Sequence, residues 1–473
     1  MRKKTFCIFL VAHCVLWTLV GLASTNIPVD SAEAIAWGQD WPLGTDKHPP
    51  MSAWVADIFY RAVPNPDLSA YLASQVCVTL SFVALWKLAR KFLSEDNAML
   101  SVLFLEGTFY YTMLSVEYNV NLVSMAVTAW MLLFFYERRW FGFGLLAGAA
   151  LLSKYTNAVF FAGLGLYLVA TRKGREEWRK PGVYIAALVA LAVFSPHLWW
   201  LWKHDFYPFE YITARMGYGE AYAKWLAHLR HPLKFMANSL GSTCVTIILF
   251  FAAYFRAKPR MKTAFARADP FIFCAGVAPA LSLFVLSAVT GLEIQSLWGF
   301  SLFGMLGIIL FSYFPCRLEE KTIRGCVRAV YVIMALSLAV YAGTSLLDTS
   351  AKSRRFDGRG LSAHVRDAFE REYGRSPAYV IGDIWNASNV SVYAPDRPRV
   401  FLNGDPRMAP WIDAEEVRRS GAVVVSGSPE QYGEYRSRRP GITAPAEWTM
   451  TLRAVTGHTR ERVIYYGFLP PEG

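Results

Sequence analysis

Long apolar runs recur from the start of this chain of 473 residues to about residue 347. Most of these runs are about twenty residues long, which is the length that a helix needs to cross a hydrocarbon core of about 30 Å. Charged residues make up only 18% of the chain and hydrophobic residues 54%, whereas a soluble chain carries a charged share of about 25% and no such runs. The pattern predicts a polytopic, all-α membrane protein.

Eleven membrane spans are predicted from these runs. The first follows three cations in residues 1–4 and is long for a signal peptide, so it is expected to be an uncleaved helix. The predicted spans cover residues 5–23, 68–87, 97–114, 119–136, 141–153, 156–171, 182–202, 235–255, 270–290, 296–314 and 329–347. An odd number of spans places the two ends of the chain on opposite sides of the membrane.

Lysine and arginine are concentrated in the loops that fall on the side of the N-terminus. These loops cover residues 87–96, 137–140, 172–180, 256–267 and 317–328. The positive-inside rule assigns that side to the cytoplasm, so the net charge of +12 is mostly a topology signal and does not indicate a nucleic-acid partner. The seven cysteines show no CxxC spacing, and this topology leaves none of them in an outer loop, as suits an oxidising compartment.

The outer side carries three substantial segments: a first loop at residues 24–67, a second at 203–231, and the tail from residue 348. The tail alternates amphipathic stretches with short apolar runs such as AYVIGD and AVVVSG, which predicts a small α/β domain. The chain is therefore divided into a membrane domain, 1–347, and an outer domain, 348–473. The outer domain is assigned to acceptor engagement or to covering a cavity.

The first outer loop is rich in acids for a segment beside a membrane: Asp30, Glu33, Asp40 and Asp46 follow the first span. A short helix is expected over 31–37, with Asp30 at or near its N-cap, and an amphipathic helix over 51–60 is expected to lie on the outer membrane surface. Spacing alone leaves two roles open for Asp30. A helix cap is the commoner role, and a general base held beside the lipid phase is the other.

Several short motifs in this order resemble a known family. They are D30-S-A-E-A-I-A-W, G44-T-D-K-H48-P-P, S153-K-Y-T, S195-P-H-L-W-W and W298-G. Over roughly residues 1–345 the chain resembles the GT-C glycosyltransferases that use polyprenyl-phosphate sugars, in the family 39 group of aminoarabinose and galacturonic-acid transferases and protein O-mannosyltransferases. The family often has two adjacent acids where this chain has Asp30-Ser31. Either Glu33 takes the role of the second acid, or this chain lacks that role.

The resemblance implies a sugar donor on a polyprenyl phosphate, an acceptor hydroxyl or amine on the outer face, and inverting transfer. Asp30 matches the position of the family's catalytic acid, and Glu33 is its candidate partner; a divalent cation held by these two acids is left open. Lysines beside an anionic lipid phosphate have a physical reason to lie on the outer side. The candidate substrate-binding residues are Lys47, His48, Lys154, Tyr155, Arg215, Glu117, Asn119 and Trp298.

The resulting hypothesis is a glycosyltransferase of the bacterial inner membrane, with a cytoplasmic N-terminus and a periplasmic C-terminal domain. It transfers sugar to an envelope lipid or glycan acceptor of the lipid A or lipopolysaccharide type. The alternatives are a protein O-mannosyltransferase and a lipid-linked sugar transporter or flippase, although transporters typically contain repeated halves and none is apparent here. Glu106, in the middle of a span, is expected to pair with a buried basic or amide group or to line the donor groove.

Overall fold

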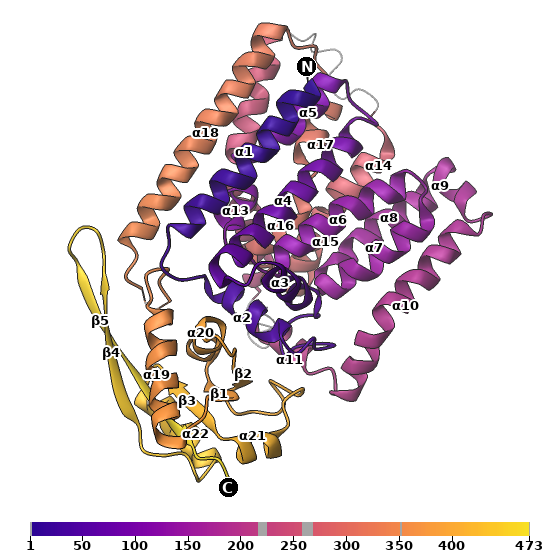
Figure 1. Cartoon of the computed structure of the whole chain (residues 1–473). Helices are drawn as coiled ribbons and strands as arrows, with labels where there is room; N and C mark the ends of the chain where they lie inside the picture. Colours follow the sequence, from indigo (N-terminus) through magenta and orange to yellow (C-terminus); the bar gives the residue numbers. More distant parts are fainter. Residues whose placement is uncertain (1, 216–224, 258–267, 351, 473) are drawn as a thin grey trace.

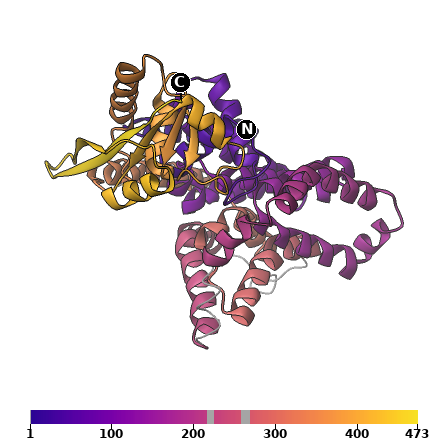
Figure 2. The same cartoon turned by 90° about the horizontal axis from the view of Figure 1, so that it is seen from below.

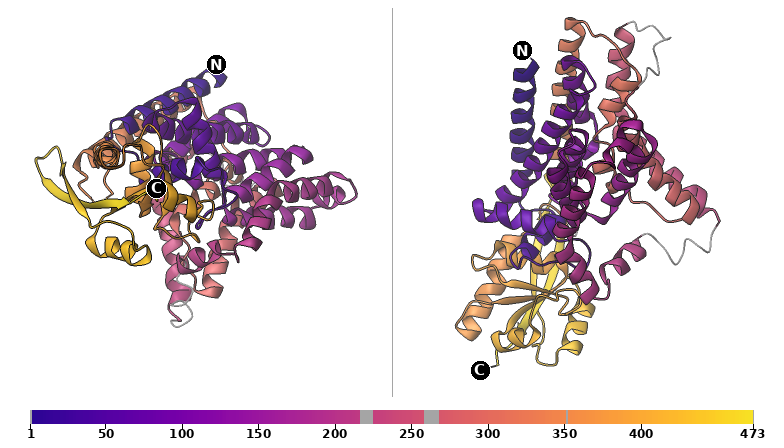
Figure 3. Two further views of the ribbon diagram at one scale, coloured as in Figure 1. Left: turned by 60° about the horizontal axis from the view of Figure 1, so that its bottom comes forward. Right: turned by 90° about the vertical axis from the view of Figure 1, so that its right-hand side faces the viewer.

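The computed structural model of the chain describes residues 2–215, 225–257, 268–350 and 352–472, except for the side chain of Arg215. A bundle of helices forms most of the molecule, and a small α/β domain lies at one end of it (Figure 1). The N-terminus lies at the opposite end of the bundle from this domain (Figure 3).

Within the described residues, six helical segments are long and apolar enough to cross a membrane. They are α1 (Arg2–Leu22), α4 (Pro66–Ala89), α10 (Gly182–Lys203), α13 (Ala227–Arg256), the segment Pro270–Thr290 that ends in α15 (Ala278–Thr290), and α18 (Glu320–Leu347). A seventh candidate is a bent pair, Ser296–Leu302 and α17 (Leu306–Tyr313), whose axes differ by 61°. The chain is therefore a multi-pass membrane protein.

The other predicted spans are shorter or broken helices. They are α5 (Glu95–Leu103), α6 (Val120–Tyr136), α7 (Trp140–Ser153) and α8 (Ala158–Ala170). Helical structure thus occupies each predicted range, but the count of eleven crossings stays a prediction.

The break after α5 coincides with a close contact to α13. Beyond Leu103 the chain continues as short 3-10 turns, and the carbonyl of Phe104 accepts a hydrogen bond of 2.5 Å from the hydroxyl of Thr246 on α13. A Cβ at Gly107 would lie 2.7 Å from the backbone nitrogen of Thr246. Glycine therefore allows α13 to approach at this point, and the threonine satisfies a carbonyl that the interrupted helix leaves without a partner.

Glu106 lies in the broken segment and is fully buried. Its carboxylate accepts hydrogen bonds from Nδ1 of His13 at 2.7 Å and from Nε1 of Trp17 at 3.2 Å, both on α1. The acid thus joins two helices inside the bundle, the first of the two arrangements expected for it.

The first outer loop folds into α2 (Val29–Gly38) and α3 (Met51–Ala62). The expected short helix is present, and it begins two residues earlier than predicted. Its N-cap is Pro28 and no side chain caps it, so Asp30 lies in the first turn, near the cap and not at it. Every residue from Ser31 to Gly38 is buried, because α2 lies between the bundle and the C-terminal domain (Figure 1). The position of the 51–60 helix on the membrane surface stays a prediction.

The C-terminal domain has the expected α/β construction. Strands β1 (Tyr379–Gly382), β2 (Arg399–Leu402) and β3 (Ala422–Ser426) are parallel, and the hairpin of β4 (Ala446–Arg453) and β5 (Thr459–Leu469) joins the sheet antiparallel, in the order β2-β1-β3-β5-β4. The helices are α19 (Gly358–Tyr373), α20 (Ile384–Tyr393), α21 (Ala414–Ser420) and α22 (Pro429–Arg438). The domain covers one side of the bundle's end, and helices between about residues 140 and 290 extend away from it (Figure 2).

Arginines of this domain pair with acids of the first outer loop. Arg399 lies 2.6 Å from Asp40, and Arg359 pairs with Asp67, whose carboxylate also accepts a hydrogen bond of 2.9 Å from the hydroxyl of Tyr393. Asp40 and Asp67 are largely buried. Much of the acidity of the first loop therefore serves to dock the C-terminal domain.

Candidate functional site

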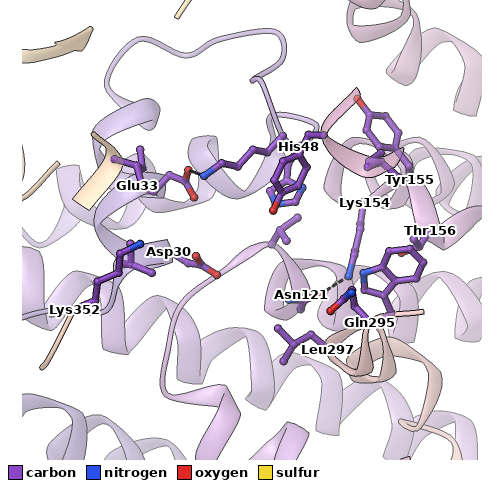
Figure 4. Close-up of a pocket in the computed structure, with 17 residues that line it drawn as sticks. Asp30, Glu33, His48, Asn121, Lys154, Tyr155, Thr156, Gln295, Leu297 and Lys352 are labelled. Atoms are coloured by element: carbon purple, nitrogen blue, oxygen red, sulfur yellow. Dashed lines mark hydrogen bonds and ion pairs between the residues drawn. The ribbon is translucent and has the colours of Figure 1, made fainter. Parts of the chain in front are cut away.

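A cavity of about 290 Å³ opens where α2 meets the bundle and the C-terminal domain (Figure 4). Segments far apart in the chain form its walls. It is lined by Val29, Asp30, Glu33, Lys47, His48, Val120, Asn121, Lys154, Tyr155, Thr156, Tyr211, Ile212, Gln295, Leu297, Trp298, Lys352 and Ile384. The cavity therefore brings together seven of the expected site residues: Asp30, Glu33, Lys47, His48, Lys154, Tyr155 and Trp298.

Asp30 and Glu33 form one wall. They are three residues apart on α2, so they share one face of the helix. The position of Asp30 in the first turn suits a negative charge, because the helix macrodipole is positive there. Figure 4 shows its carboxylate pointing into the cavity, with Lys154 on the opposite wall.

Glu33 forms an ion pair with Lys47, with Nζ 2.5 Å from Oε1. Burial raises the pKa of Glu33 to about 7, helped by the negative charges of Asp30 and Asp46 and opposed by Lys47. Burial acts to lower the pKa of Lys47, but the carboxylates of Glu33 and Asp46 outweigh it and raise this pKa above its ordinary value. Lys47 therefore keeps its positive charge at neutral pH, whereas Glu33 gains or loses its proton near neutral pH.

The loop that carries Lys47 and His48 is fixed by local bonds. The backbone nitrogen and the hydroxyl of Thr45 donate to the carbonyl of His48 at 3.2 and 2.9 Å. The ring of His48 lies edge-on to Tyr211 of α11 (Pro208–Arg215), with the ring centroids 5.9 Å apart. Lys47 is thus presented to the cavity by a closed turn just before α3 begins.

Lys154 forms the opposite wall, at the break between α7 and α8. Its ammonium donates to Oδ1 of Asn121 at 2.5 Å and lies 5.4 Å from the ring centroid of Trp298. Asn119 accepts hydrogen bonds of 2.9 Å from the backbone and from the side chain of Asn121. Asn119 is therefore the N-cap of α6 and lies behind the wall, and Asn121 takes the place in the cavity that was expected for Asn119.

Two other residues, Glu117 and Arg215, were expected to contact substrate. Glu117 does not line the cavity; its carboxylate accepts a hydrogen bond of 3.4 Å from the backbone nitrogen of Asp30, behind α2. Burial, together with the charge of Asp30, raises the pKa of Glu117. The side chain of Arg215 lies outside the described part of the chain.

Tyr155 is tied to the first loop through His197. Nδ1 of His197 donates to the carbonyl of Leu43 at 2.6 Å, so in a neutral ring Nε2 accepts the hydroxyl hydrogen of Tyr155 at 2.8 Å. This chain of hydrogen bonds connects the 42–48 segment to α10 and fixes the wall that Tyr155 contributes.

Sequence reasoning missed residues that only the tertiary structure brings to the cavity. Lys352, Ile384, Gln295, Thr156 and Tyr211 belong to this group. Lys352 and Ile384 come from the chain beyond the last span, and Lys352 adds a third cation to the cavity (Figure 4). Thr156 belongs to the S153-K-Y-T motif but was not singled out, and no quoted motif contains the other four residues.

The donor set for a metal ion is small. The described residues contain no group of three or more histidine, cysteine or carboxylate side chains placed to hold one. The ammonium of Lys47 already lies against Glu33. A divalent cation at Asp30 and Glu33 stays a prediction.

An apolar groove of about 340 Å³ lies in the bundle next to the polar cavity. It is lined by Phe235, Met236, Ser239, Leu240, Thr243, Ile247, Gly276, Val277, Ala280, Leu281, Phe284, Leu302, Phe303, Leu306 and Ile309. A narrow space shares Lys154 and Trp298 with the polar cavity and Leu302 with the groove. A charged pocket and a surface suited to a hydrocarbon chain are thus neighbours.

Comparison with known proteins agrees with this arrangement. Residues 47–200 match the family model described as dolichyl-phosphate-mannose-protein mannosyltransferase. The chain is 26% identical over 420 residues to the lipid A galacturonosyltransferase RgtD of Rhizobium johnstonii, covering 78% of this chain and 85% of that protein.

The same fold occurs in ArnT from Cupriavidus metallidurans. The structure bound to undecaprenyl phosphate is 14% identical with a TM-score of 0.62 over 97% of both chains, and the apo structure is 13% identical with a TM-score of 0.63 over 98% of both. Together the comparisons confirm the resemblance to the GT-C, ArnT-like group of glycosyltransferases.

Proposed function

We propose that this membrane protein is a glycosyltransferase that moves a sugar from a polyprenyl-phosphate donor to a lipid acceptor of the lipid A type. The observation that carries the proposal is a single cavity in which Asp30 faces Lys154, with Lys47 beside it and an apolar groove adjoining. A polyprenyl-phosphate sugar likewise has a polar part and an apolar part, because a charged phosphate joins the sugar to a long hydrocarbon chain. The names of the relative and of the ArnT structure support a lipid-linked donor and a lipid acceptor.

The cavity can perform an inverting displacement. Asp30 takes the proton from the acceptor hydroxyl, whose oxygen forms a bond to the anomeric carbon of the sugar. The bond from that carbon to the phosphate oxygen breaks, and the leaving polyprenyl phosphate keeps the electron pair. Lys47 and Lys154 stabilise its negative charge, and a positioned base contributes about 10²–10⁴-fold to such a step.

The two lipid tails need separate surfaces. The apolar groove between α13, α15 and α17 takes the polyprenyl tail of the donor, because the narrow space that adjoins it at Leu302 is also lined by Lys154 and Trp298. The acceptor enters from the side of α2 and the C-terminal domain, where Lys352 lies. This side is the periplasmic face of the inner membrane in the proposed topology.

The test is transfer of radiolabelled sugar by the purified full-length protein in lipid nanodiscs. Galacturonate and aminoarabinose donors on polyprenyl phosphate are offered with lipid A, and a hydroxyl-bearing peptide serves as the second acceptor, since the matched family model is named for a protein mannosyltransferase. Asp30→Asn is expected to reduce transfer to lipid A at least 100-fold. Asp40→Asn is the matched control, because Asp40 is an acid of the same loop that pairs with Arg399 outside the cavity.

Undiminished transfer by Asp30→Asn would overturn the role of Asp30. Movement of the intact donor across the bilayer without transfer would overturn the enzyme assignment in favour of a flippase. Transfer to the peptide and not to lipid A would overturn the acceptor class.

A further inference from the structure

A second polar groove, of about 810 Å³, lies at the end of the bundle away from the C-terminal domain. It lies at the C-terminal ends of α4 and α6, whereas the first residues of α4 contact the C-terminal domain through Asp67. It is lined by Lys87, Arg90, Lys91, Trp130, Leu133, Tyr136, Glu137 and Arg139. The groove is separate from the proposed active site and plays no part in the transfer chemistry.

Cations exceed acids in this groove. Its single lining carboxylate, Glu137, already contacts Lys91 at 2.6 Å and Arg139 at 3.7 Å. Arg90 reaches Glu95 at the exposed rim, 3.1 Å away, and among the described residues Lys87 has no carboxylate partner. Four cations therefore share two carboxylates, Glu137 and Glu95, and the two positive charges in excess repel one another unless an anion joins them.

Some cations elsewhere at this end of the bundle have carboxylate partners. Arg2 pairs with both Asp96 and Glu320. Glu177 pairs with Arg138 at 3.5 Å and with Lys180 at 2.9 Å. Those cations lie in separate pairs, whereas the four cations of the groove line one cavity, which the general cationic bias of a cytoplasmic surface does not require.

Aromatic rings hold the cations around the groove. Lys87 lies 4.8 Å from the ring centroid of Trp130, and Arg139 lies 4.9 Å from that of Phe134. Cation–π contacts of this kind keep the charged ends near the wall. Tyr136 is the last residue of α6 and Trp130 lies within its last two turns, and tryptophan and tyrosine near helix ends mark the headgroup level of a bilayer.

We propose that this groove binds the phosphate headgroup of an anionic phospholipid of the cytoplasmic leaflet. The cations supply the charge, and Trp130, Leu133 and Tyr136 supply apolar surface for the first part of the lipid chains. That apolar wall favours a lipid over free phosphate, which offers it no contact. Basic pockets between helices on the cytoplasmic side are suited to such headgroups.

The test is native mass spectrometry of the delipidated full-length protein titrated with phosphatidylglycerol or with phosphatidylcholine of the same chains. The wild type is expected to prefer phosphatidylglycerol. Lys87→Gln with Arg139→Gln is expected to weaken that preference about tenfold or more, since each cation near an anionic lipid contributes about fivefold. Lys87→Arg keeps the charge and is expected to keep the preference.

The matched control is Lys173→Gln with Arg179→Gln. It removes two exposed charges from the same side of the proposed topology, outside the groove. An equal loss of preference in this control would show that the effect is general surface charge, and the proposal would fail. It would also fail if the wild type showed no preference, or if millimolar inorganic phosphate displaced the lipid completely.

Discussion

The guanidinium of Arg397 donates a hydrogen bond of 2.9 Å to the main-chain carbonyl of Ile35. Ile35 lies on α2, the helix that carries Asp30 and Glu33 into the cavity. The same guanidinium lies 3.4 Å from a carboxylate oxygen of Asp57 and 4.0 Å from the ring centroid of Tyr60. The C-terminal domain thus holds the helix of the proposed base through a residue that does not line the cavity.

Arg397→Gln is therefore expected to affect both stability and transfer. Asp57 is fully buried and keeps Arg61 and Trp41 as partners, so the loss in unfolding free energy is expected to be about 1–3 kcal/mol. The rate of transfer falls as α2 loses its support. Thermal unfolding and the transfer assay measure the two effects. The control is Arg407→Gln, whose exposed pair with Glu210 is expected to contribute less than about 1 kcal/mol; equal effects of the two variants would contradict the positioning role.

Lys154→Gln is expected to lower kcat/KM for the polyprenyl-phosphate donor about 10- to 1000-fold. The variant loses the cation that lies against Asn121 and faces Asp30, while a polar side chain of similar length remains. Steady-state transfer kinetics measure the change. Lys203→Gln removes an exposed lysine that lies over Trp199 outside the cavity and is expected to behave as the wild type; a comparable loss there would point to general lipid attraction.

Donor binding is expected to tighten as the pH falls through about 7. Glu33 has its pKa raised to about 7, so below that pH it becomes neutral and the cavity gains net positive charge beside Lys47. The donor phosphate is anionic, and its KM is expected to fall accordingly. Kinetics from pH 6 to 8 on the wild type and on Glu33→Gln make the measurement, and the variant is expected to show a flat KM; an unchanged slope would assign the titration to another group.

Lys352→Gln is expected to raise the KM of an anionic substrate several-fold and to leave kcat nearly unchanged. Lys352 lines the cavity from the chain beyond the last span and is exposed, so it contributes charge without supporting the fold. Lys352→Arg keeps the charge and is expected to restore the wild-type KM. A large fall in kcat with unaltered KM would argue against a binding role.

Glu106→Leu is expected to destabilise the protein by about 2–4 kcal/mol. It leaves the ring nitrogen of His13 and the indole nitrogen of Trp17 buried without their acceptor. Replacing His13 with phenylalanine in the same protein is expected to recover part of the lost stability. Two packed apolar side chains destabilise the interior less than one buried polar group that has lost its partner. Thermal unfolding in detergent distinguishes the two variants, and full recovery is not expected because Trp17 still lacks its partner.

The membrane helices could be predicted from the sequence because the length of an apolar run is a property of consecutive residues. A run of about twenty apolar residues has to be helical in a bilayer, whatever its neighbours, and helical structure occupies every range in which one was expected. The break after Leu103 could not be predicted, because it occurs where Thr246 contacts Phe104, and Thr246 lies 142 residues beyond Phe104 in the chain.

The site divides in the same way. Asp30, Glu33, Lys47 and Lys154 were identified from motifs that each span only a few residues. The structure places all four on one cavity. The direction in which α2 faces decides that Asp30 points into the cavity. The direction in which α6 faces decides that Asn121, and not Asn119, lies at the cavity wall. Neighbouring residues of a helix point in different directions, so packing makes that choice.

By itself, the sequence determined a helical membrane chain with an acidic first outer loop and an α/β tail. Only the tertiary structure decided that the acids Asp40, Asp57 and Asp67 dock arginines of that tail while Asp30 and Glu33 face the cavity. The physical reason is that a carboxylate carries the same charge in every context. Its role is set by the cation or the solvent that folding brings to it from a distant part of the chain.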